Sequence, residues 1–377
     1  MHNYQLSIIN RRTKQEQSKT CFSYALRGGG RPKANRRQDE SHQACLNRRQ
    51  AESHQACLNG RGAKEEDEVN GRGAKEEGEA NDQLRRRRHV LLVCLSCLFL
   101  SCLPDDEASF SPYAQKVYAY LPAPGQFINA GFTCHTMDEA CHYAEERLAE
   151  GAYVSLGGFG GYIVVGFDHA VANDGGYNIA VTGNAFTNAS EPGVVWVMHD
   201  ENGNGLPDDT WYELRGSEHG RPETLHDYAV TYYRPSSPQQ PVRWTDNRGQ
   251  SGEVDYLGAY HSQDYYYPLW VEDDSYTLTG TRLKARNEAL DDNGSSWVNG
   301  DFEWGYADNY STIDRLSATD RDNHFRISDA VRPDGTDANL PSIHFVKIQT
   351  ATNAKSGWLG ENSTEVLAVK DYNMMRN

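Results

Sequence analysis

The stretch "GVVWVMHDENGNGLPDDTWYELR" (residues 193–215) contains two apolar segments separated by one polar turn. Short runs of Val, Trp and Tyr are typical of β-strands, whereas Gly, Asn, Asp and Pro are typical of the turns between strands. The stretch therefore predicts a strand at 193–198, a second strand at 210–215 and a loop that joins them.

The same pattern recurs from about residue 152 to the C-terminus. Further predicted strands include "YIVVGF" (162–167), "NIAVTG" (178–183), "YAVTYYR" (228–234), "VRWT" (242–245), "SYTLTGTRLKA" (275–285), "HFRIS" (324–328), "SIHFVKIQT" (342–350) and "STEVLAVKD" (363–371). Many short strands without interleaved helices predict an all-β fold, mainly an antiparallel β-sandwich or jelly roll. The run 285–312 is the longest predicted loop.

One segment near the start of this region has helical periodicity instead. The stretch 136–150 begins with Thr136, a good N-cap residue, and places Met137, Ala140, Ala144 and Leu148 on one face. We therefore expect one short N-terminal helix in an otherwise β-structured domain.

The charge distribution divides the chain into two unlike parts. Residues 1–102 contain 19 Lys and Arg against 12 Asp and Glu, whereas residues 103–377 contain 18 against 41. The acidic part also holds all seven tryptophans. Its negative charge argues against nucleic-acid binding, which needs a basic face, and suits a soluble protein. No Pro/Ser-rich linker divides 110–377, so we expect a single domain at 103–377.

Residues 1–84 contain tandem near-repeats with few apolar residues. "NRRQDESHQACLN" is followed by "RRQAESHQACLN", and "GRGAKEEDEVN" is followed by "GRGAKEEGEAN". Such units are too short and too polar to stack as a repeat protein. They indicate either a disordered basic arm or translated upstream repeat DNA, and the second interpretation is favoured.

Residues 85–102 have the layout of a signal peptide. Four arginines (85–88) precede an apolar core (90–100) that is too short to span a bilayer, and Ser101 and Cys102 follow. This layout resembles a bacterial lipoprotein signal in which Cys102 is lipidated, although Phe99 stands where Leu is usual; Cys97 is a weaker alternative. The "LPDDE" after Cys102 resembles the export signal of Bacteroidetes surface lipoproteins. We expect a lipid-anchored protein on the outer face of the outer membrane.

Two cysteines remain in the mature chain, within "CHTMDEACH" (134–142). Zinc, a disulfide and two free thiols are all compatible with this stretch. The spacing lacks the CxxC or HxxxH pairs of usual zinc sites, so a disulfide between Cys134 and Cys141 is favoured and zinc is the weakest alternative.

The loop "DENGNGLPDD" has oxygen-bearing side chains at alternate positions. Asp200, Asn202 and Asn204 occupy positions 1, 3 and 5 of the first half of an EF-hand pattern, and Gly205 occupies position 6. Trp211 stands where the closing Glu of that pattern would be. The alternative is an Asx-rich turn, but the spacing favours a structural calcium site. Its predicted ligands are Asp200, Asn202, Asn204, the Leu206 carbonyl, Asp208 and Asp209.

No catalytic motif is evident in the mature part, which lacks HExxH and GxSxG. We therefore expect a binding protein and not an enzyme. The alternative is a glycan-degrading enzyme, which would need two facing carboxylates that sequence alone does not reveal.

Aromatic residues in two predicted loops, 261–270 and 295–310, suggest a surface that stacks on a flat ligand, either a sugar ring of a glycan or a large planar cofactor. The candidate ligand-binding residues are Tyr265, Tyr266, Tyr267, Trp270, Trp297 and Trp304. Their rings are equally compatible with a place in the core, and sequence does not decide between the two.

Several stretches together resemble a Bacteroidetes cell-surface lipoprotein family found with cobalamin-uptake loci. They are "GNAFTNASEPGVVWVMHDENGNGLPDDTWYELRGSE" (183–218), "YHSQDYYYPLW" (260–270), "SYTLTGTRLKARN" (275–287) and "LPSIHFVKIQTATNAKSGWLGENSTEV" (340–366). The resemblance implies non-catalytic capture of a small ligand, cobalamin first, beside a TonB-dependent transporter. It identifies no ligand-contacting residue.

Overall fold

The computed structural model describes residues 109–376. The predictions for 1–84, for the signal peptide 85–102 and for lipidation of Cys102 lie outside the described residues. Within the described range, no helix combines the length and the apolar character needed to cross a bilayer.

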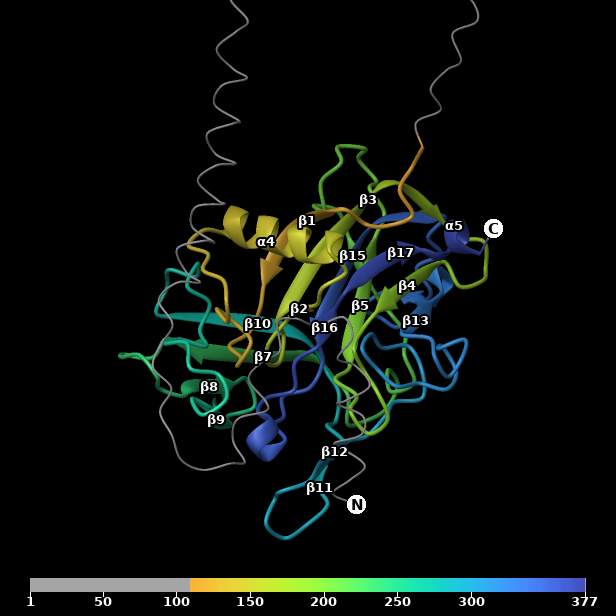
Figure 1. The fold of residues 1–377 in the computed structure, drawn as a ribbon. Coiled ribbons are helices and arrows are strands. Elements are labelled where there is room, and N and C mark those ends of the chain that lie inside the picture. Colours follow the sequence, from red (N-terminus) through yellow and green to blue (C-terminus); the bar gives the residue numbers. More distant parts are fainter. Residues whose placement is uncertain (1–108, 377) are drawn as a thin grey trace, which may run out of the picture. The chain divides into compact units, whose positions relative to one another are not determined.

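A six-stranded sheet forms the centre of the unit (Figure 1). The long strands β3 and β15 lie side by side in it, and their apolar runs are buried because other elements cover both faces. In spatial order its strands are β1 (Lys116–Leu121), β3 (Tyr162–Ala172), β15 (Ser342–Thr350), β5 (Gly193–Met198), β6 (Trp211–Leu214) and β14 (Ala330–Val331).

A three-stranded sheet packs on the same core. It consists of β13 (Asp322–Phe325), β4 (Ile179–Thr182) and β17 (Ala368–Asp371). Its Val181 and Val369 belong to one buried cluster with Val165, Val195 and Val346 of the large sheet. The two sheets therefore contribute to one apolar core.

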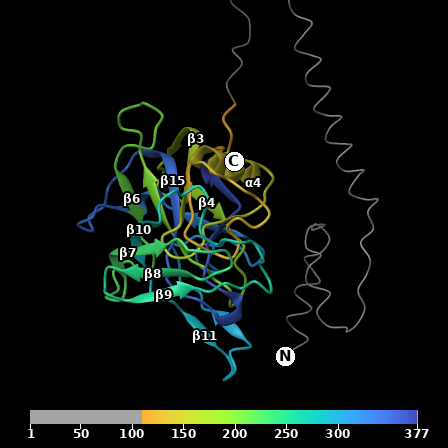
Figure 2. The same ribbon diagram turned by 90° about the vertical axis from the view of Figure 1, so that its left-hand side faces the viewer.

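A four-stranded sheet has a core of its own. Its order is β10 (Ser275–Arg282), β7 (Leu225–Tyr233), β8 (Val242–Asp246) and β9 (Ser251–Val254), and Figure 2 shows β7, β8 and β9 in succession. Tyr228, Val230 and Tyr232 of β7 point inward and pack with Phe159 and Leu278. The alternate residues of β7 are less buried, so one face of this sheet remains open to solvent.

The predicted mainly antiparallel all-β fold is confirmed, because every pair of named strands is antiparallel. The helix is α4 (Met137–Ala149), and the Thr136 side chain caps it by accepting from the Glu139 N–H at 3.2 Å. Ala140 and Ala144 pack against the core as expected, whereas Met137 is exposed. A second short helix that sequence did not indicate, α5 (Tyr372–Met375), ends the described chain.

Several short elements complete the unit. The predicted loop 285–312 contains a small hairpin of β11 (Asn287–Ala289) and β12 (Trp297–Asn299), so it is not wholly irregular. The segment "HFRIS" ends as a strand at Phe325 and continues into the 3-10 helix η1 (Ile327–Asp329). The remaining elements are the pair β2 (Val154–Ser155) and β16 (Glu365–Val366) and the 3-10 helix η2 (Gly357–Leu359).

Candidate functional site

The predicted calcium loop joins two neighbouring strands of the large sheet. Met198 of β5 pairs with Trp211 of β6, so the residues between them form the end of a hairpin. Gly203 and Gly205 have φ values of 69° and 72°, a conformation that favours glycine and lets the loop coil.

The predicted side-chain ligands of this loop gather around one another. The Asp200 carboxylate accepts from the Gly205 N–H at 2.9 Å and from the Asn204 N–H at 3.2 Å. The amides of Asn202 and Asn204 donate to Asp208 at 3.1 and 3.0 Å. Rotation of either side-chain amide by 180° would place its oxygen, instead of its nitrogen, next to Asp208. A cation bound by Asp208 and the amide together would require this oxygen as a ligand.

The side chains of Asp209 and Leu206 are placed differently. The Asp209 carboxylate accepts from the Glu201 N–H at 2.8 Å, so it also closes onto the loop, whereas the Leu206 side chain is exposed. The loop therefore brings together the carboxylates and amides that the spacing predicts, in an arrangement stabilised by its own hydrogen bonds.

A second group of acids, which sequence did not identify, lies inside the protein. Oxygen atoms of Glu191, Asp308 and Glu365 all lie within 4.8 Å of one another. Glu191 precedes β5, Glu365 begins β16, and the chain holds Asp308 at a positive φ of 52°. Among the described residues, no Lys or Arg forms an ion pair with any of the three.

Burial dominates the electrostatics of these three carboxyl groups. It raises the pKa of Glu191 to about 8, with the nearby Asp308 as the second cause. Burial also raises the pKa of Asp308 to about 6, although the N–H groups of Glu365, Asn184 and Ala185 stabilise its charged form. The pKa of Glu365 lies well above its usual value for the same reasons. Such a cluster must retain protons or hold a cation, and it is a possible metal-binding group.

Cys134 and Cys141 are both free thiols, so the favoured disulfide is absent from the structure. Cys134 is buried at the core next to α4, and Cys141 lies on α4 itself. Burial, with Glu139 nearby, raises the pKa of the Cys134 thiol to about 11. Neither thiol belongs to a potential metal-binding group of the described residues.

The six aromatic residues proposed from sequence separate into two sets. Tyr266, Tyr267 and Trp270 are at most 6% exposed and pack in the core. Their polar atoms have internal partners: Tyr266 donates to the His261 carbonyl and Tyr267 to the Asp273 carbonyl. Tyr265, Trp297 and Trp304 are partly exposed, so the stacking role predicted for the six residues can apply only to these three.

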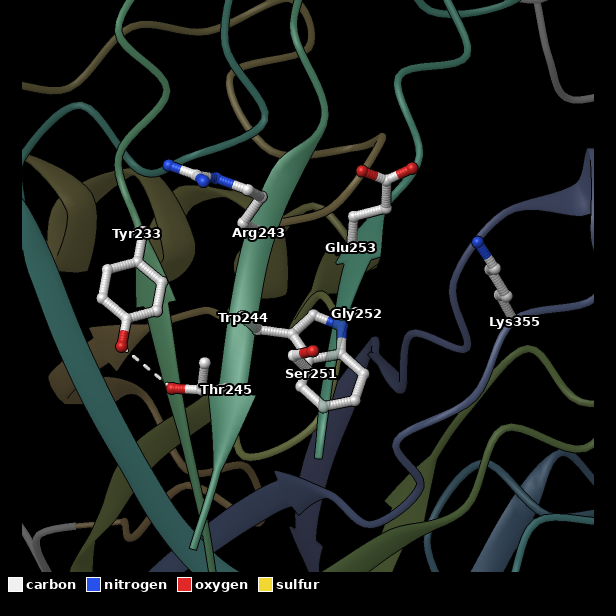
Figure 3. A pocket seen from close by; sticks show the side chains of 8 residues that line it. All are labelled: Tyr233, Arg243, Trp244, Thr245, Ser251, Gly252, Glu253 and Lys355. Atoms are coloured by element: carbon white, nitrogen blue, oxygen red, sulfur yellow. Dashed lines mark hydrogen bonds between the residues drawn. The ribbon is translucent and has the colours of Figure 1, made fainter. Parts of the chain in front are cut away.

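A groove of about 690 Å³ lies along strands β8 and β9 of the four-stranded sheet. Figure 3 shows its lining along β8 and β9, with the Tyr233 ring at one side and the Glu253 carboxylate and Lys355 at the other. The residues that line it are Tyr233, Arg243, Trp244, Thr245, Ser251, Gly252, Glu253 and Lys355. Its volume falls within the usual range for small-molecule sites.

Particular contacts fix the shape of this groove. The Tyr233 hydroxyl and the Thr245 hydroxyl are hydrogen-bonded at 2.9 Å. Trp244 pairs with Gly252 across the two strands, and a Cβ at Gly252 would lie 2.5 Å from the Trp244 ring. The glycine therefore lets the indole lie across the β9 backbone. Lys355 is held beside the groove by Asp255 at 2.7 Å.

A smaller cavity of about 220 Å³ includes one of the predicted aromatics, Trp304. Two acids, Asp314 and Asp329, also line it, and burial raises the pKa of both. The Asp314 carboxylate already accepts from the Gly305 N–H at 2.6 Å and from the Asn323 amide at 3.0 Å.

Sequence reasoning missed the groove because its residues come from separate strands. Tyr233, Arg243 and Glu253 belong to β7, β8 and β9 and meet only when these strands pair. The one available signal was the alternation in "VRWTD" (242–246), which sends Arg243 and Thr245 outward. No protein-family model matches the chain, and no curated protein matches it significantly.

Proposed function

We propose that this protein is a cell-surface lipoprotein that captures a small ligand without chemical conversion. The observation that carries the proposal is the groove on β8 and β9, where the Tyr233 ring is combined with Arg243, Glu253 and Lys355. A partly exposed ring offers a stacking surface, and charged groups around it set the orientation of a polar ligand.

Cobalamin is the first candidate ligand, and it rests on the family resemblance. Its flat corrin ring, amide side chains and phosphodiester suit a site that offers an aromatic face and two cationic side chains, Arg243 and Lys355. In this proposal Cys102 anchors the protein to the outer membrane and a TonB-dependent transporter receives the ligand. Calcium bound by the loop 200–209 would hold the β5–β6 hairpin rigid and would be structural.

The composition of the groove favours binding over catalysis. Glu253 is the only carboxylate among the eight residues that line it. Hydrolysis of a glycosidic bond by the usual mechanisms needs two carboxylates on opposite sides of the bond. A glycan is therefore the alternative ligand of the groove, bound by stacking and released unchanged.

The alternative function is a glycan-degrading enzyme, and the smaller cavity is the observation that favours it. Trp304 lies there with two acids of raised pKa, Asp314 and Asp329. If this cavity were catalytic, Asp329→Asn would abolish turnover of a glycan by the purified protein.

Isothermal titration of the purified protein with cyanocobalamin and with a panel of soluble glycans tests the proposal. We expect saturable binding of cobalamin with 1:1 stoichiometry and no release of reducing sugar from any glycan. Absence of binding up to millimolar cobalamin would remove the vitamin from the proposal. Turnover of a glycan that Asp329→Asn abolishes would replace capture with catalysis.

A further inference from the structure

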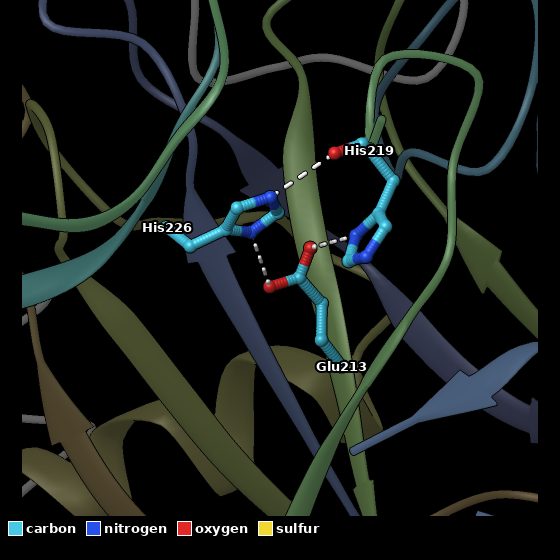
Figure 4. A group of neighbouring side chains, drawn as sticks. All are labelled: Glu213, His219 and His226. Carbon is cyan, nitrogen blue, oxygen red and sulfur yellow. Dashed lines mark hydrogen bonds and ion pairs between the residues drawn. The ribbon is translucent and has the colours of Figure 1, made fainter. Parts of the chain in front are cut away.

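A group of two histidines and one glutamate lies between the two larger sheets and shares no residue with the groove or with the predicted calcium loop. Glu213 is in β6 of the six-stranded sheet, His226 is in β7 of the four-stranded sheet, and His219 lies in the connection between them. One potential ligand atom of each residue lies within 4.8 Å of the other two. Figure 4 shows the three side chains converging.

The spacing of these atoms suits a small divalent ion. Nδ1 of His219 is 3.1 Å from one Glu213 oxygen, and Nδ1 of His226 is 3.8 Å from the other. Zinc binds imidazole nitrogen and carboxylate oxygen at about 2.0–2.2 Å, so neighbouring ligands in a tetrahedral site lie about 3.3 Å apart. The two observed distances bracket that value, so an ion could enter with small movements of the side chains.

The orientation of His226 is that of a metal ligand. Its Nε2 faces the backbone carbonyl of His219 at 3.0 Å, so this nitrogen is the donor. In the neutral ring the lone pair then lies on Nδ1, which faces Glu213. Metal-bound histidines usually donate their second N–H to a carbonyl or carboxylate in this way.

The carboxylate is also held in place from the other side. The Thr281 hydroxyl of β10 donates to Glu213 at 2.5 Å, while β5 and β14 flank Glu213 in the sheet through Trp196 and Val331. Glu213 is therefore rigid and buried, and His226 is half-exposed, with 44% of its side chain accessible. An ion has both a fixed ligand and a route from solvent.

We propose that Glu213, His219 and His226 bind a divalent transition-metal ion of zinc type, which links the six-stranded sheet to the four-stranded sheet. Two imidazoles and one carboxylate are the donors that such ions accept, and they leave one coordination position for water. Without the ion, the same residues form a hydrogen-bonded Glu–His cluster. When the ion binds, metal–ligand bonds would replace those hydrogen bonds and would cross-link β6 and β7.

Zinc titration of the purified, tag-free protein after treatment with a chelator tests the proposal. We expect one high-affinity site and an increase in melting temperature on saturation, since a ligand that binds only the folded state stabilises it. His226→Gln and His219→Gln should each abolish stoichiometric binding. Thr281→Val should weaken it by roughly 10- to 100-fold, the usual cost of losing a residue that orients a metal ligand.

His142→Gln is the matched control. His142 lies on the exposed face of α4 beside Glu145 and Glu146, at 3.8 and 3.3 Å, so it offers the same donor types without a built site. This variant should bind zinc as the wild type does. Loss of binding in His142→Gln but not in His226→Gln, or a wild type with no stoichiometric zinc, would overturn the proposal.

A measurement on the unaltered protein tests the proposal even if the variants fail to fold. Cobalt(II) substituted for zinc should give the visible absorption of a four- or five-coordinate site and should be displaced by zinc. A spectrum equal to that of hydrated cobalt would contradict the proposal.

Discussion

The hydroxyl of Tyr118 in β1 donates to the backbone carbonyl of Gly205, at 3.1 Å. Two strands of the sheet, β3 and β15, separate β1 from the β5–β6 hairpin that contains Gly205. The hairpin loop therefore reaches back across the end of the sheet. The Tyr118 ring also packs edge-on against Phe345 of β15, with ring centroids 5.1 Å apart, so the residue that holds the loop is itself fixed.

Calcium should stabilise the protein through this loop. Saturation at about 100 times the dissociation constant would add about 2.7 kcal/mol to the free energy of unfolding. That corresponds to an increase of roughly 5–10 °C in melting temperature for a domain of this size. Scanning calorimetry of chelated and calcium-loaded protein measures the difference. Asp200→Asn should abolish it, whereas Asp227→Asn, an exposed acid outside the loop, should not; equal melting temperatures with and without calcium would argue against the site.

Stability should decrease as pH rises from about 5 to 8. Burial raises the pKa of Glu361 to about 8, although the Gln126 N–H donates to one carboxylate oxygen at 2.7 Å and so stabilises the charged form. The second oxygen is buried without a hydrogen-bond partner. Over this range the native state keeps a proton that the unfolded chain has released, so each increase in pH favours unfolding. Below the pKa of the unfolded group, both states are protonated and the effect vanishes.

Glu361→Gln tests the contribution of this residue to the pH dependence. The variant keeps the acceptor for Gln126 and removes the titrating group, so its melting temperature should decline less between pH 5 and 8 and exceed that of the wild type at pH 8. Glu303→Gln, an exposed carboxylate, is the control and should follow the wild type. Parallel curves for Glu361→Gln and the wild type would show that Glu361 is not the titrating group.

Gly157 should tolerate no side chain. It has a φ of 69°, and a Cβ there would lie 2.0 Å from the Ala123 carbonyl oxygen. Gly131 has a similar φ of 80° but no atom within 4 Å of its Cβ position. Gly131→Ala should therefore cost only the left-handed backbone penalty of about 1–2 kcal/mol. Gly157→Ala should cost about 1–3 kcal/mol more because it overpacks the core. Denaturant unfolding measures both, and equal losses would contradict the predicted steric clash.

The fold was predictable where local pattern and burial agree. Strands such as 193–198 and 342–350 are apolar and β-branched because the large sheet is covered on both faces, so sequence alone identifies them. Short strands such as β2 and β14, of two residues each, carry no such periodicity. These strands form because neighbouring strands offer hydrogen-bond partners, and the local sequence does not show which segments will become neighbours.

The candidate sites were likewise predictable only where their residues are close together in sequence. The loop 200–209 is continuous in sequence, so its spacing predicted which side chains would meet. Glu191, Asp308 and Glu365 meet only through the tertiary fold, and a lone acid in sequence resembles any surface acid. Sequence did not decide whether Tyr266 and Tyr267 are exposed or buried. Their segment packs against Phe159 and the four-stranded sheet, so both rings lie in the core instead of on a binding surface.

The central claim is capture of a small ligand in the groove on β8 and β9. Titration of the double variant Tyr233→Ala, Arg243→Ala with cobalamin tests it most directly, because both side chains line the groove and face solvent. Tyr260→Ala is the control, since Tyr260 is an aromatic residue of 53% exposure outside the groove. We predict that the double variant loses at least about 10-fold in affinity, the equivalent of 1.4 kcal/mol, while Tyr260→Ala binds as the wild type does. Unchanged affinity in the double variant, with binding intact in the wild type, would contradict the account.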